Sequence, residues 1–365
     1  MTLDTASDSP AGTTTTVPYR LTRLGVVMEP EPGNPVEAEG VLNPASGRDA
    51  DGRLWLLPRL VSAGNVSRVG LAEVVVTDGV PAGVRRAGVV LEAANAWERG
   101  ADHGGVEDPR TTWVPVLGLH VMTYVAFGPL GPRPALAVST DLRAWRRLGP
   151  VWFRWEPELD ADLNLYGNKD CVVFPEPVTA PDGRRCLAML HRPTWDLTDL
   201  RPTEGVRAPN GSADSRPAMW ISYVPVDDVL ADTGALTAMG QHREFARGVH
   251  AWEALKVGAG PPPIRVPEGW LLLHHGVSGS IAPGWGPQAD VFYSAGAMIL
   301  DADEPRRVLA RTAEPLMAPS TVEEVSGTVG NVVFPTAIEQ VEGVRYVFYG
   351  MADARIGVAR LDHTV

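Results

Sequence analysis

The stretches LWLLPRL (54–60) and SRVGLAEV (67–74) form a pair that returns along the whole chain: a short apolar strand, then a strand of small and apolar residues. The other pairs are LHVMTYVAF (119–127) with RPALAVST (133–140), RCLAMLHRP (185–193) with PAMWISYV (217–224), GWLLLHHGV (269–277) with YSAGAMIL (293–300), and VRYVFYGMAD (344–353) with ARIGVARL (354–361). The second strands begin about 60 to 85 residues apart, a spacing that suits the four-stranded blade of a β-propeller. The sequence therefore predicts an all-β fold, a five-bladed β-propeller.

The composition agrees with many short strands joined by turns. The 365 residues include 38 glycines and 33 prolines, and 44% of the chain is hydrophobic. Asp-Gly or Glu-Gly pairs occur in four segments and predict tight hairpins: DADGR (49–53), TDG (77–79), APDGR (180–184) and VEGVR (341–345). We expect residues 18–365 to form a single propeller domain and the polar residues 1–17 to be a disordered tail.

The net charge of −12 argues against nucleic acid or an anionic membrane as the main partner. No apolar run has the length of a membrane span, and residues 1–17 lack the features of a signal peptide, so we expect a cytoplasmic protein. Cys171 and Cys186 are expected to be reduced core residues. His274 and His275 have no Cys or His partners at zinc-ligand spacing, so no metal is expected. The sequence leaves open whether the chain forms a homo-oligomer.

Polar residues mark the ends of the first strands of the repeats. In a propeller these ends share one mouth of the central channel. The residues found there are Arg59, His191, Arg192, His274, His275 and Asp353. We expect function at this mouth.

The segment GVEDPR (105–110) supplies candidate acids before the second repeat. In an extended chain Glu107 and Asp108 point to opposite sides, and Pro109 is expected to keep Asp108 extended. One acid can then face the channel. The alternative is a surface turn with a salt bridge to Arg110.

Cationic and donor groups recur near the same ends. GNKDCVVFPE (167–176) contributes Asn168, Lys169 and Asp170, and Arg192 offers a planar fork of donors that suits phosphate or carboxylate. WEALKVGAGPPPI (252–264) places Lys256 before a Gly- and Pro-rich turn. Each motif alone also fits an ordinary polar turn. Together they predict an anion site in an otherwise acidic protein.

The ordered motifs GVEDPR, GNKDCVVFPE, HRP, VGAGPPPI, GWLLLHHGV, ILDADEPRRVLART, NVVFPT and YGMAD, from about Asn43 to Leu361, resemble glycoside hydrolase family 130. The resemblance implies a five-bladed propeller and either an inverting mannoside phosphorylase or a β-1,2-mannosidase. It implies that Asp108 is the general acid and relays its proton through a mannose hydroxyl. It also implies mannose contacts by Asn43, Arg59 and Asp353, and phosphate contacts by Asn168, Arg192 and Lys256. Gly167 departs from the arginine that some phosphorylases carry there.

We therefore expect an inverting β-mannoside phosphorylase that acts on β-1,2-linked manno-oligosaccharides, with phosphate as co-substrate and no cofactor. Glu107, Asp170 and His275 are expected to contact the sugar and Lys169 the phosphate. The alternative is an inverting β-1,2-mannosidase, which needs a second carboxylate to activate water. Glu176, Glu253 or Asp170 could supply it. A third alternative is a sugar-binding propeller without catalysis. Loops 194–216 and 278–292 are expected to set the linkage.

Overall fold

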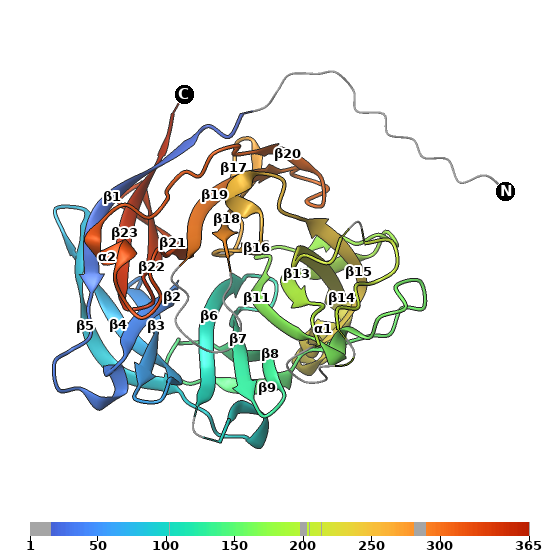
Figure 1. The fold of residues 1–365 in the computed structure, drawn as a ribbon, viewed down its shortest axis with the longest axis horizontal. Coiled ribbons are helices and arrows are strands. Elements are labelled where there is room, and N and C mark those ends of the chain that lie inside the picture. Colours follow the sequence, from blue (N-terminus) through green and yellow to red (C-terminus); the bar gives the residue numbers. More distant parts are fainter. Residues whose placement is uncertain are drawn as a thin grey trace.

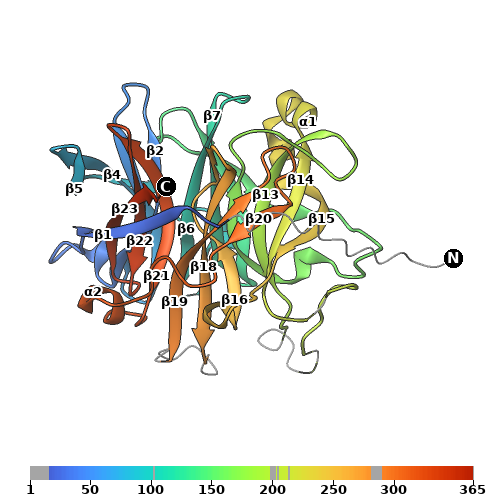
Figure 2. The same cartoon turned by 90° about the horizontal axis from the view of Figure 1, so that it is seen from above.

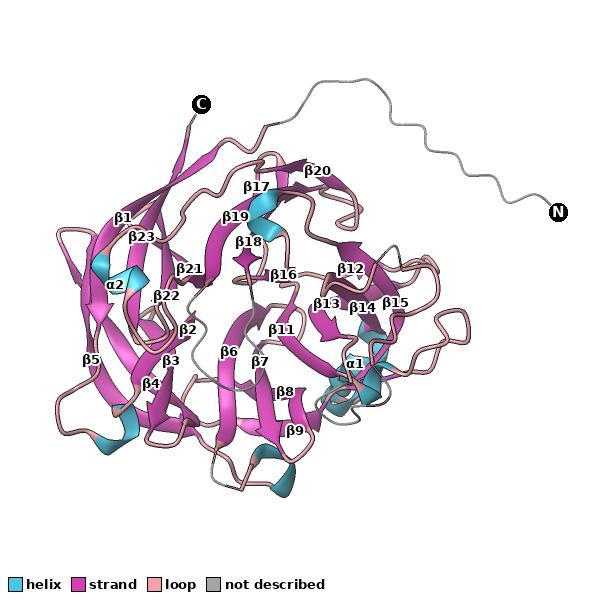
Figure 3. Ribbon diagram, viewed as in Figure 1, coloured by secondary structure: helices cyan, strands magenta, loops and turns pink. Residues whose placement is uncertain are grey.

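The computed structural model describes residues 16–364 except 102, 198–202, 204, 213 and 281–289. The chain is all-β, and the described strands form four sheets arranged in a ring (Figures 1 and 3). The largest, eight-stranded sheet consists of two antiparallel groups that are paired only where β4 (Val66–Thr77) and β6 (Gly104–Val114) run in parallel, at Val66 with Gly104 and Ser67 with Gly105. The described strands thus fall into five groups, each built from four antiparallel main strands. Of the predicted tail, residues 1–15 lie outside the described part.

The groups follow one another along the chain. The first contains β2 (Gly40–Arg48), β3 (Leu54–Ser62), β4 (Val66–Thr77) and β5 (Val80–Leu91). The second contains β6 (Gly104–Val114), β7 (Leu119–Gly128), β8 (Gly131–Ser139) and β9 (Arg146–Pro150). The third contains β11 (Gly167–Val173), β13 (Arg185–Thr194), β14 (Met219–Pro225) and β15 (Ala238–Ala246), with the short β10 (Trp152–Phe153) and β12 (Val178–Thr179) at its edges.

The fourth group contains β16 (Lys256–Ala259), β18 (Gly269–Gly279), β19 (Val291–Leu300) and β20 (Val308–Arg311), with β17 (Ile264–Val266) beside β18. The fifth contains β21 (Val333–Val341), β22 (Val344–Met351), β23 (Arg355–His363) and β1 (Tyr19–Met28). The first strand of the chain is therefore the outer strand of the last group. Tyr19 pairs with His363, which joins the two ends of the described chain and closes the ring (Figures 1 and 2).

Helices are short and lie in the connections. The α-helices are α1 (Val226–Ala231) and α2 (Val322–Val325), and the 3-10 helices are η1 (Pro35–Glu37), η2 (Ala96–Glu98), η3 (Leu163–Leu165), η4 (Thr233–Thr237) and η5 (Ala251–Glu253). Among the described residues, no helix combines the length and the apolar character needed to span a membrane.

All five strand pairs predicted from the sequence are confirmed as antiparallel pairs: β3 with β4, β7 with β8, β13 with β14, β18 with β19 and β22 with β23. Their apolar side chains fill the space between neighbouring groups. One such cluster joins the third and fourth groups through Val172, Leu190, Val257 and Leu272, which are fully buried. Cys171 and Cys186 are free and buried, as expected.

At least two strands of each group, the innermost and the outer one, were not predicted from the sequence. Figure 1 shows β2, β6, β11, β16 and β21 around the centre of the ring. The sequence placed the segments GVEDPR and GNKDC before the first strands of their repeats, but they form the innermost strands β6 and β11. The strands predicted as first in each repeat are second in their groups.

A glutamate–arginine pair recurs in every group and ties its entry loop to its outer strand. The glutamate precedes the innermost strand, and the arginine lies on the outermost of the four main strands of the group. The pairs, with their shortest printed hydrogen bonds, are Arg86–Glu37 (2.8 Å), Arg147–Glu98 (2.9 Å), Arg243–Glu156 (3.1 Å), Arg311–Glu253 (2.7 Å) and Arg23–Glu324 (2.7 Å). We call each pair a clasp. Four of these carboxylates are buried, those of Glu37, Glu98, Glu253 and Glu324, and each is stable there because the arginine and backbone N–H groups satisfy it.

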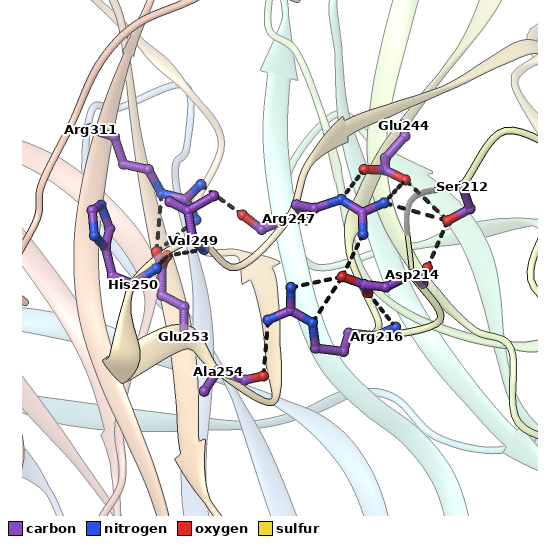
Figure 4. A network of polar contacts seen from close by, with 10 residues as sticks. All are labelled: Ser212, Asp214, Arg216, Glu244, Arg247, Val249, His250, Glu253, Ala254 and Arg311. Carbon is purple, nitrogen blue, oxygen red and sulfur yellow. Dashed lines mark hydrogen bonds and ion pairs between the residues drawn. The ribbon is translucent and has the colours of Figure 1, made fainter.

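The fourth clasp shows the arrangement in detail (Figure 4). Glu253 is fully buried, and its Oε2 accepts hydrogen bonds from the backbone N–H groups of Val249 (3.1 Å) and His250 (3.3 Å). Its Oε1 accepts from Arg311, and it also contacts His274 Nε2 at 2.8 Å. Burial opposes ionisation of Glu253, but His274 and Arg311 outweigh it and lower its pKa to about 2. The clasp is therefore an ion pair at neutral pH.

Candidate active site

A cavity of about 380 Å³ lies among the N-terminal halves of the innermost strands. Nine predicted site residues line it: Asn43, Arg59, Asp108, Lys169, Asp170, Arg192, Lys256, His275 and Asp353. Thr194, Val291, Tyr293, Val329, Val332 and Phe334 complete the described lining. We call it the charged cavity. Segments far apart in the sequence meet here because each group sends its innermost strand to the same centre.

Three of these side chains owe their direction to irregular backbone. Asn43, Asp108 and Asp170 have positive φ angles of 43°, 46° and 54°. Each lies at a break in the register of its strand with the neighbouring strand. A bulge adds a residue to one strand and re-aims its side chain. The prediction that Pro109 keeps Asp108 extended is wrong, because the bulge places Asp108 in the left-handed region.

Asp108 is held by two neighbours from the first group. Its Oδ1 accepts hydrogen bonds from Asn43 Nδ2 (2.8 Å) and Arg59 Nη1 (3.1 Å). Arg59 also donates to Glu107 Oε1 at 2.9 Å, so it binds both adjacent acids. Burial alone would raise the pKa of Asp108, but the charges of Arg59 and Lys169 outweigh it and hold the pKa below its usual range. In the free protein Asp108 is a carboxylate.

The other cavity acid behaves differently. Burial raises the pKa of Asp353 to about 6, and repulsion from Asp108 adds to the rise although Arg59 opposes it. Asp353 is therefore the carboxyl group of the cavity that gains a proton just below neutral pH. The two acids, both near Arg59, therefore take up a proton at different pH, Asp353 at a higher pH than Asp108.

The cationic side of the cavity comes from the third and fourth groups. Arg192 Nε donates to Asp170 Oδ2 at 2.6 Å, and His275 Nε2 lies 3.3 Å from the same oxygen. Lys169 Nζ approaches Glu107 Oε2 at 3.5 Å. Lys256 Nζ lies 5.1 Å from the centre of the Tyr293 ring. Burial and the nearby Arg192 lower the pKa of Lys256 to about 7.

Two predicted residues lie behind the cavity wall. Asn168 is 1% exposed, and its Nδ2 lies 2.9 Å from His191 Nδ1. Glu107 is 2% exposed, and its two carboxylate oxygens accept hydrogen bonds from Arg59 and Lys169. Neither lines the charged cavity as the structure describes it. Their predicted contacts with phosphate and sugar remain predictions; of the two, Glu107 contacts the cavity residues Arg59 and Lys169.

Two histidines predicted at the mouth point away from it. His191 contacts Ser222 Oγ at 2.8 Å, and His274 belongs to the fourth clasp. Successive side chains of a strand face opposite sides, so Arg192 and His275 reach the cavity while their neighbours do not. Within the described residues no three His, Cys, Asp or Glu side chains form a metal-binding group.

Gly258 of the KVGAG segment cannot be replaced by a larger residue because two side chains lie close to its Cα. A Cβ at Gly258 would lie 2.2 Å from Asp170 Oδ2 and 2.5 Å from the His275 ring. These contacts would displace the pair that faces Arg192. The glycine in this motif is therefore needed for packing as well as for the turn that follows it.

The alternative interpretation of GVEDPR, a surface turn with a salt bridge to Arg110, is wrong because Arg110 is buried. It is 1% exposed, and its Nε donates to the carbonyl of Gly260 (2.9 Å), which reaches from the second group to the fourth. Its Nη1 donates to the carbonyls of Asp108 and Pro109. The residue fixes the bulge that carries Asp108. No motif in the sequence pointed to Tyr293, whose ring faces Lys256 Nζ.

The charge of the cavity should change near neutral pH. Lys256 is protonated below about pH 7 and neutral above it, and Asp353 becomes anionic above about pH 6. Both changes make the cavity less positive as pH rises. We expect sulfate, a dianion across this range, to bind more weakly at pH 8 than at pH 6, as measured by calorimetry. Lys256→Met should remove the part of the change centred near pH 7, and a flat wild-type profile would contradict the assignment.

Known proteins resemble this chain in sequence and in fold. A family model described as beta-1,4-mannooligosaccharide phosphorylase matches residues 34–365. A 1,2-beta-oligomannan phosphorylase of Thermoanaerobacter sp. is 30% identical over 262 residues, which cover 71% of this chain and 68% of that protein. A beta-1,4-mannooligosaccharide phosphorylase of Ruminococcus albus is 41% identical over 140 residues, 38% of this chain and 40% of that protein. The solved beta-1,2-mannobiose phosphorylase of Listeria innocua superposes with a TM-score of 0.66 at 20% identity, covering 94% of this chain and 96% of that one.

Proposed function

The chain belongs to glycoside hydrolase family 130, and from this membership we propose that it is an inverting β-mannoside phosphorylase. The reaction cleaves β-1,2-linked manno-oligosaccharides with inorganic phosphate and gives α-mannose 1-phosphate. One observation carries the proposal: Lys169, Arg192 and Lys256 line the same cavity as Asp108, in a chain of net charge −12. The β-1,2 linkage rests on the 1,2-beta-oligomannan phosphorylase among the relatives.

In the proposed reaction phosphate replaces the water and the general base of an ordinary inverting glycosidase. A phosphate oxygen attacks the anomeric carbon from the face opposite the leaving sugar. The new bond joins this oxygen to the anomeric carbon as the glycosidic bond breaks. Asp108 supplies the proton that the leaving oxygen takes up, relayed through a mannose hydroxyl. The cationic groups stabilise the dianion.

Phosphate binding would also prepare the acid. Asp108 is ionised in the free cavity because Arg59 and Lys169 oppose its protonation. A dianion beside Lys169 offsets part of this positive field, so the pKa of Asp108 rises when phosphate is bound. We therefore propose that phosphate loading brings Asp108 into its acidic form. This coupling would make the acid available only when the attacking group is present.

The geometry disfavours the hydrolase alternative. Glu253 is committed to the fourth clasp, and Glu176 pairs with Arg265 at 3.1 Å and is absent from the described cavity lining. Asp170 does line the cavity, but its Oδ2 is held by Arg192. Of the three bases considered, only Asp170 remains, and it is neutralised by an arginine.

The direct test is phosphate dependence. Purified protein is incubated with β-1,2-mannobiose with and without phosphate, and the released sugars are identified. We expect cleavage only with phosphate, and mannose 1-phosphate in the α configuration as product. Cleavage without phosphate to free mannose would establish the hydrolase, and no cleavage under either condition would favour a sugar-binding protein.

Removing a cationic side chain should weaken phosphate more than sugar. Lys256→Ala and Arg192→Ala each delete a charge-assisted contact, so the KM for phosphate is expected to rise about 10-fold or more while the KM for mannobiose changes little. Steady-state kinetics with each substrate varied in turn measures both constants. Arg184→Ala, which removes a surface arginine paired with Asp182, is the matched control. Equal effects on both constants would mean that the anion site lies elsewhere.

We further propose that the five strand groups are the blades of a five-bladed propeller and that residues 18–365 form one catalytic domain. Three observations support this: the five antiparallel groups, the repeated clasps and the closure of the fifth group by β1. The proposed reaction uses phosphate as the co-substrate of the saccharide and needs no cofactor. Cytoplasmic localisation, the oligomeric state and the roles of loops 194–216 and 278–292 remain predictions from the sequence, and parts of both loops lie outside the described residues.

A further inference from the structure

A second cavity, of about 500 Å³, lies at the other end of the ring. The innermost strands reach it a few residues after they pass the charged cavity. Asn43 on β2, Asp108 on β6 and Phe334 on β21 line the charged cavity. Further along the same three strands, Ser46, Thr111 and Glu339 line the second cavity. Since a strand rises about 3.3 Å per residue, these steps correspond to roughly 10–17 Å. Arg110, between Asp108 and Thr111 in sequence, spans the ring to Gly260.

The wall of this second cavity combines apolar rings with polar groups. Trp113 is 47% exposed, and its ring centre lies 4.7 Å from that of His120. We call this space the tryptophan cavity. Its apolar lining is completed by Pro175, Pro262, Pro263, Ile264 and Ile338. A half-exposed indole among proline rings offers a flat surface to the C–H face of a ligand.

Two buried polar atoms in the wall have no partner. Thr111 is 6% exposed and His120 is 4% exposed, and neither Thr111 Oγ1 nor His120 Nδ1 makes a hydrogen bond in the described structure. Burial lowers the pKa of His120, so its ring is neutral at neutral pH. Unsatisfied buried polar groups are costly, and a ligand hydroxyl would satisfy both kinds of atom.

The charges of the tryptophan cavity are already balanced. Arg48 Nε lies 3.6 Å from Glu339 Oε2, and Glu339 Oε1 accepts a hydrogen bond from Ser46 Oγ at 2.8 Å. Asp49 is occupied by the indole N–H of Trp55 (2.9 Å) and by backbone N–H groups of its own turn. Asp49 Oδ2 also lies 3.9 Å from Arg53 Nη1, so each charged side chain of the described lining has a partner of opposite charge. A neutral ligand with many hydroxyl groups fits best.

We propose that the tryptophan cavity binds a neutral saccharide, with a sugar ring stacked on Trp113 and its hydroxyls bound by Glu339, Thr111 and His120. This site is separate from the charged cavity and does not rest on the proposed reaction. Its place at the opposite end of the ring means that it does not contribute to bond cleavage. It would hold an additional saccharide, or another part of a long one, on the protein.

Calorimetry with β-1,2-mannobiose tests the proposal on the full chain carrying Asp108→Asn, which suppresses turnover. We expect two sites per chain, one of which is lost when Trp113→Ala is added. Trp152→Ala, which removes a tryptophan that is 60% exposed and lies outside both described cavity linings, should retain both. A stoichiometry that Trp113→Ala leaves unchanged would overturn the proposal, as would a second site that takes mannose 1-phosphate but not mannobiose.

Glu339→Gln is a second test, which still applies if the Trp113→Ala variant fails to fold. It keeps the size of the side chain and should weaken the second site about 10-fold while leaving the site in the charged cavity unchanged. An unchanged affinity in this variant as well as in Trp113→Ala would refute the site. A single site that is lost with Trp113→Ala would support this inference while contradicting the proposed function of the charged cavity, so the two failures can be told apart.

Discussion

Replacing Asp108 by asparagine is expected to lower the turnover of an unactivated mannobiose by about 10²–10⁴-fold, because the variant cannot supply the proton to the leaving oxygen. The fold should be retained. An asparagine Oδ1 can still accept the hydrogen bonds from Asn43 and Arg59, and asparagine tolerates the positive φ of 46° at this position. The measurement is the initial rate of mannose 1-phosphate formation at saturating phosphate, with the circular dichroism spectrum as the test of folding.

Asp78→Asn is the matched control for this variant. Asp78 has a similar φ of 50°, but it lies in the exposed turn between β4 and β5. Its substitution makes the same chemical change on the same kind of backbone, far from the charged cavity, and the rate should stay near that of the wild type. Near-normal turnover by Asp108→Asn would show that the acid is another residue, and Asp353, with its pKa of about 6, would be the next one to test.

The second large effect concerns stability. Glu253→Ala leaves Arg311, His274 and two backbone N–H groups without their buried carboxylate. Removing one partner of a buried ion pair costs roughly 3–5 kcal/mol, so the free energy of unfolding in urea should fall by about that amount. The expected loss is a large fraction of the stability of an ordinary domain.

A surface pair provides the comparison. Glu304 is bound to Arg306 at 2.6 Å, but its side chain is 55% exposed. Glu304→Ala should therefore change the free energy of unfolding by no more than about 1 kcal/mol. If Glu253→Ala proves as mild as this control, the clasps are incidental contacts and do not hold the entry loops to the outer strands.

The apolar hairpins were predictable, and the innermost strands were not. Strand pairs such as β18 and β19 stand out because buried strands are nearly continuous runs of apolar residues bounded by turns. In β6 and β11 the run is interrupted by Asp108 and Asp170, whose bulges break the two-residue alternation. Proline, glycine and acidic residues in these strands suggest loops to any reading of local pattern. The residues that these strands contribute to the candidate site are the same residues that break the strand pattern in the sequence.

The candidate site was largely visible because its residues occur in short distinctive motifs. What the motifs could not show is which of two neighbours faces the cavity, as with Arg192 and His191. That depends on the register with β11, which is set by a bulge. The clasps did leave a signal in the repeated Ala-Trp-Glu at 96–98 and 251–253, whose glutamates occupy equivalent places. The tryptophan cavity left none, because its lining is gathered from separate strands.

The closure of the ring by β1 has a consequence for the order in which the protein is completed during synthesis. Of the described strands, β1 leaves the ribosome before the others, and β23, its partner in the sheet, is made after them. Arg23 on β1 must likewise wait for Glu324. The fifth group therefore cannot assemble until β23 has been made, and pairing β1 with β23 closes a loop that spans all the other strand groups. Until then the nascent chain carries β1 as an unpaired strand, so the pairing of β1 with β23 is the step at which a chaperone is most useful and at which two unfinished chains would exchange strands.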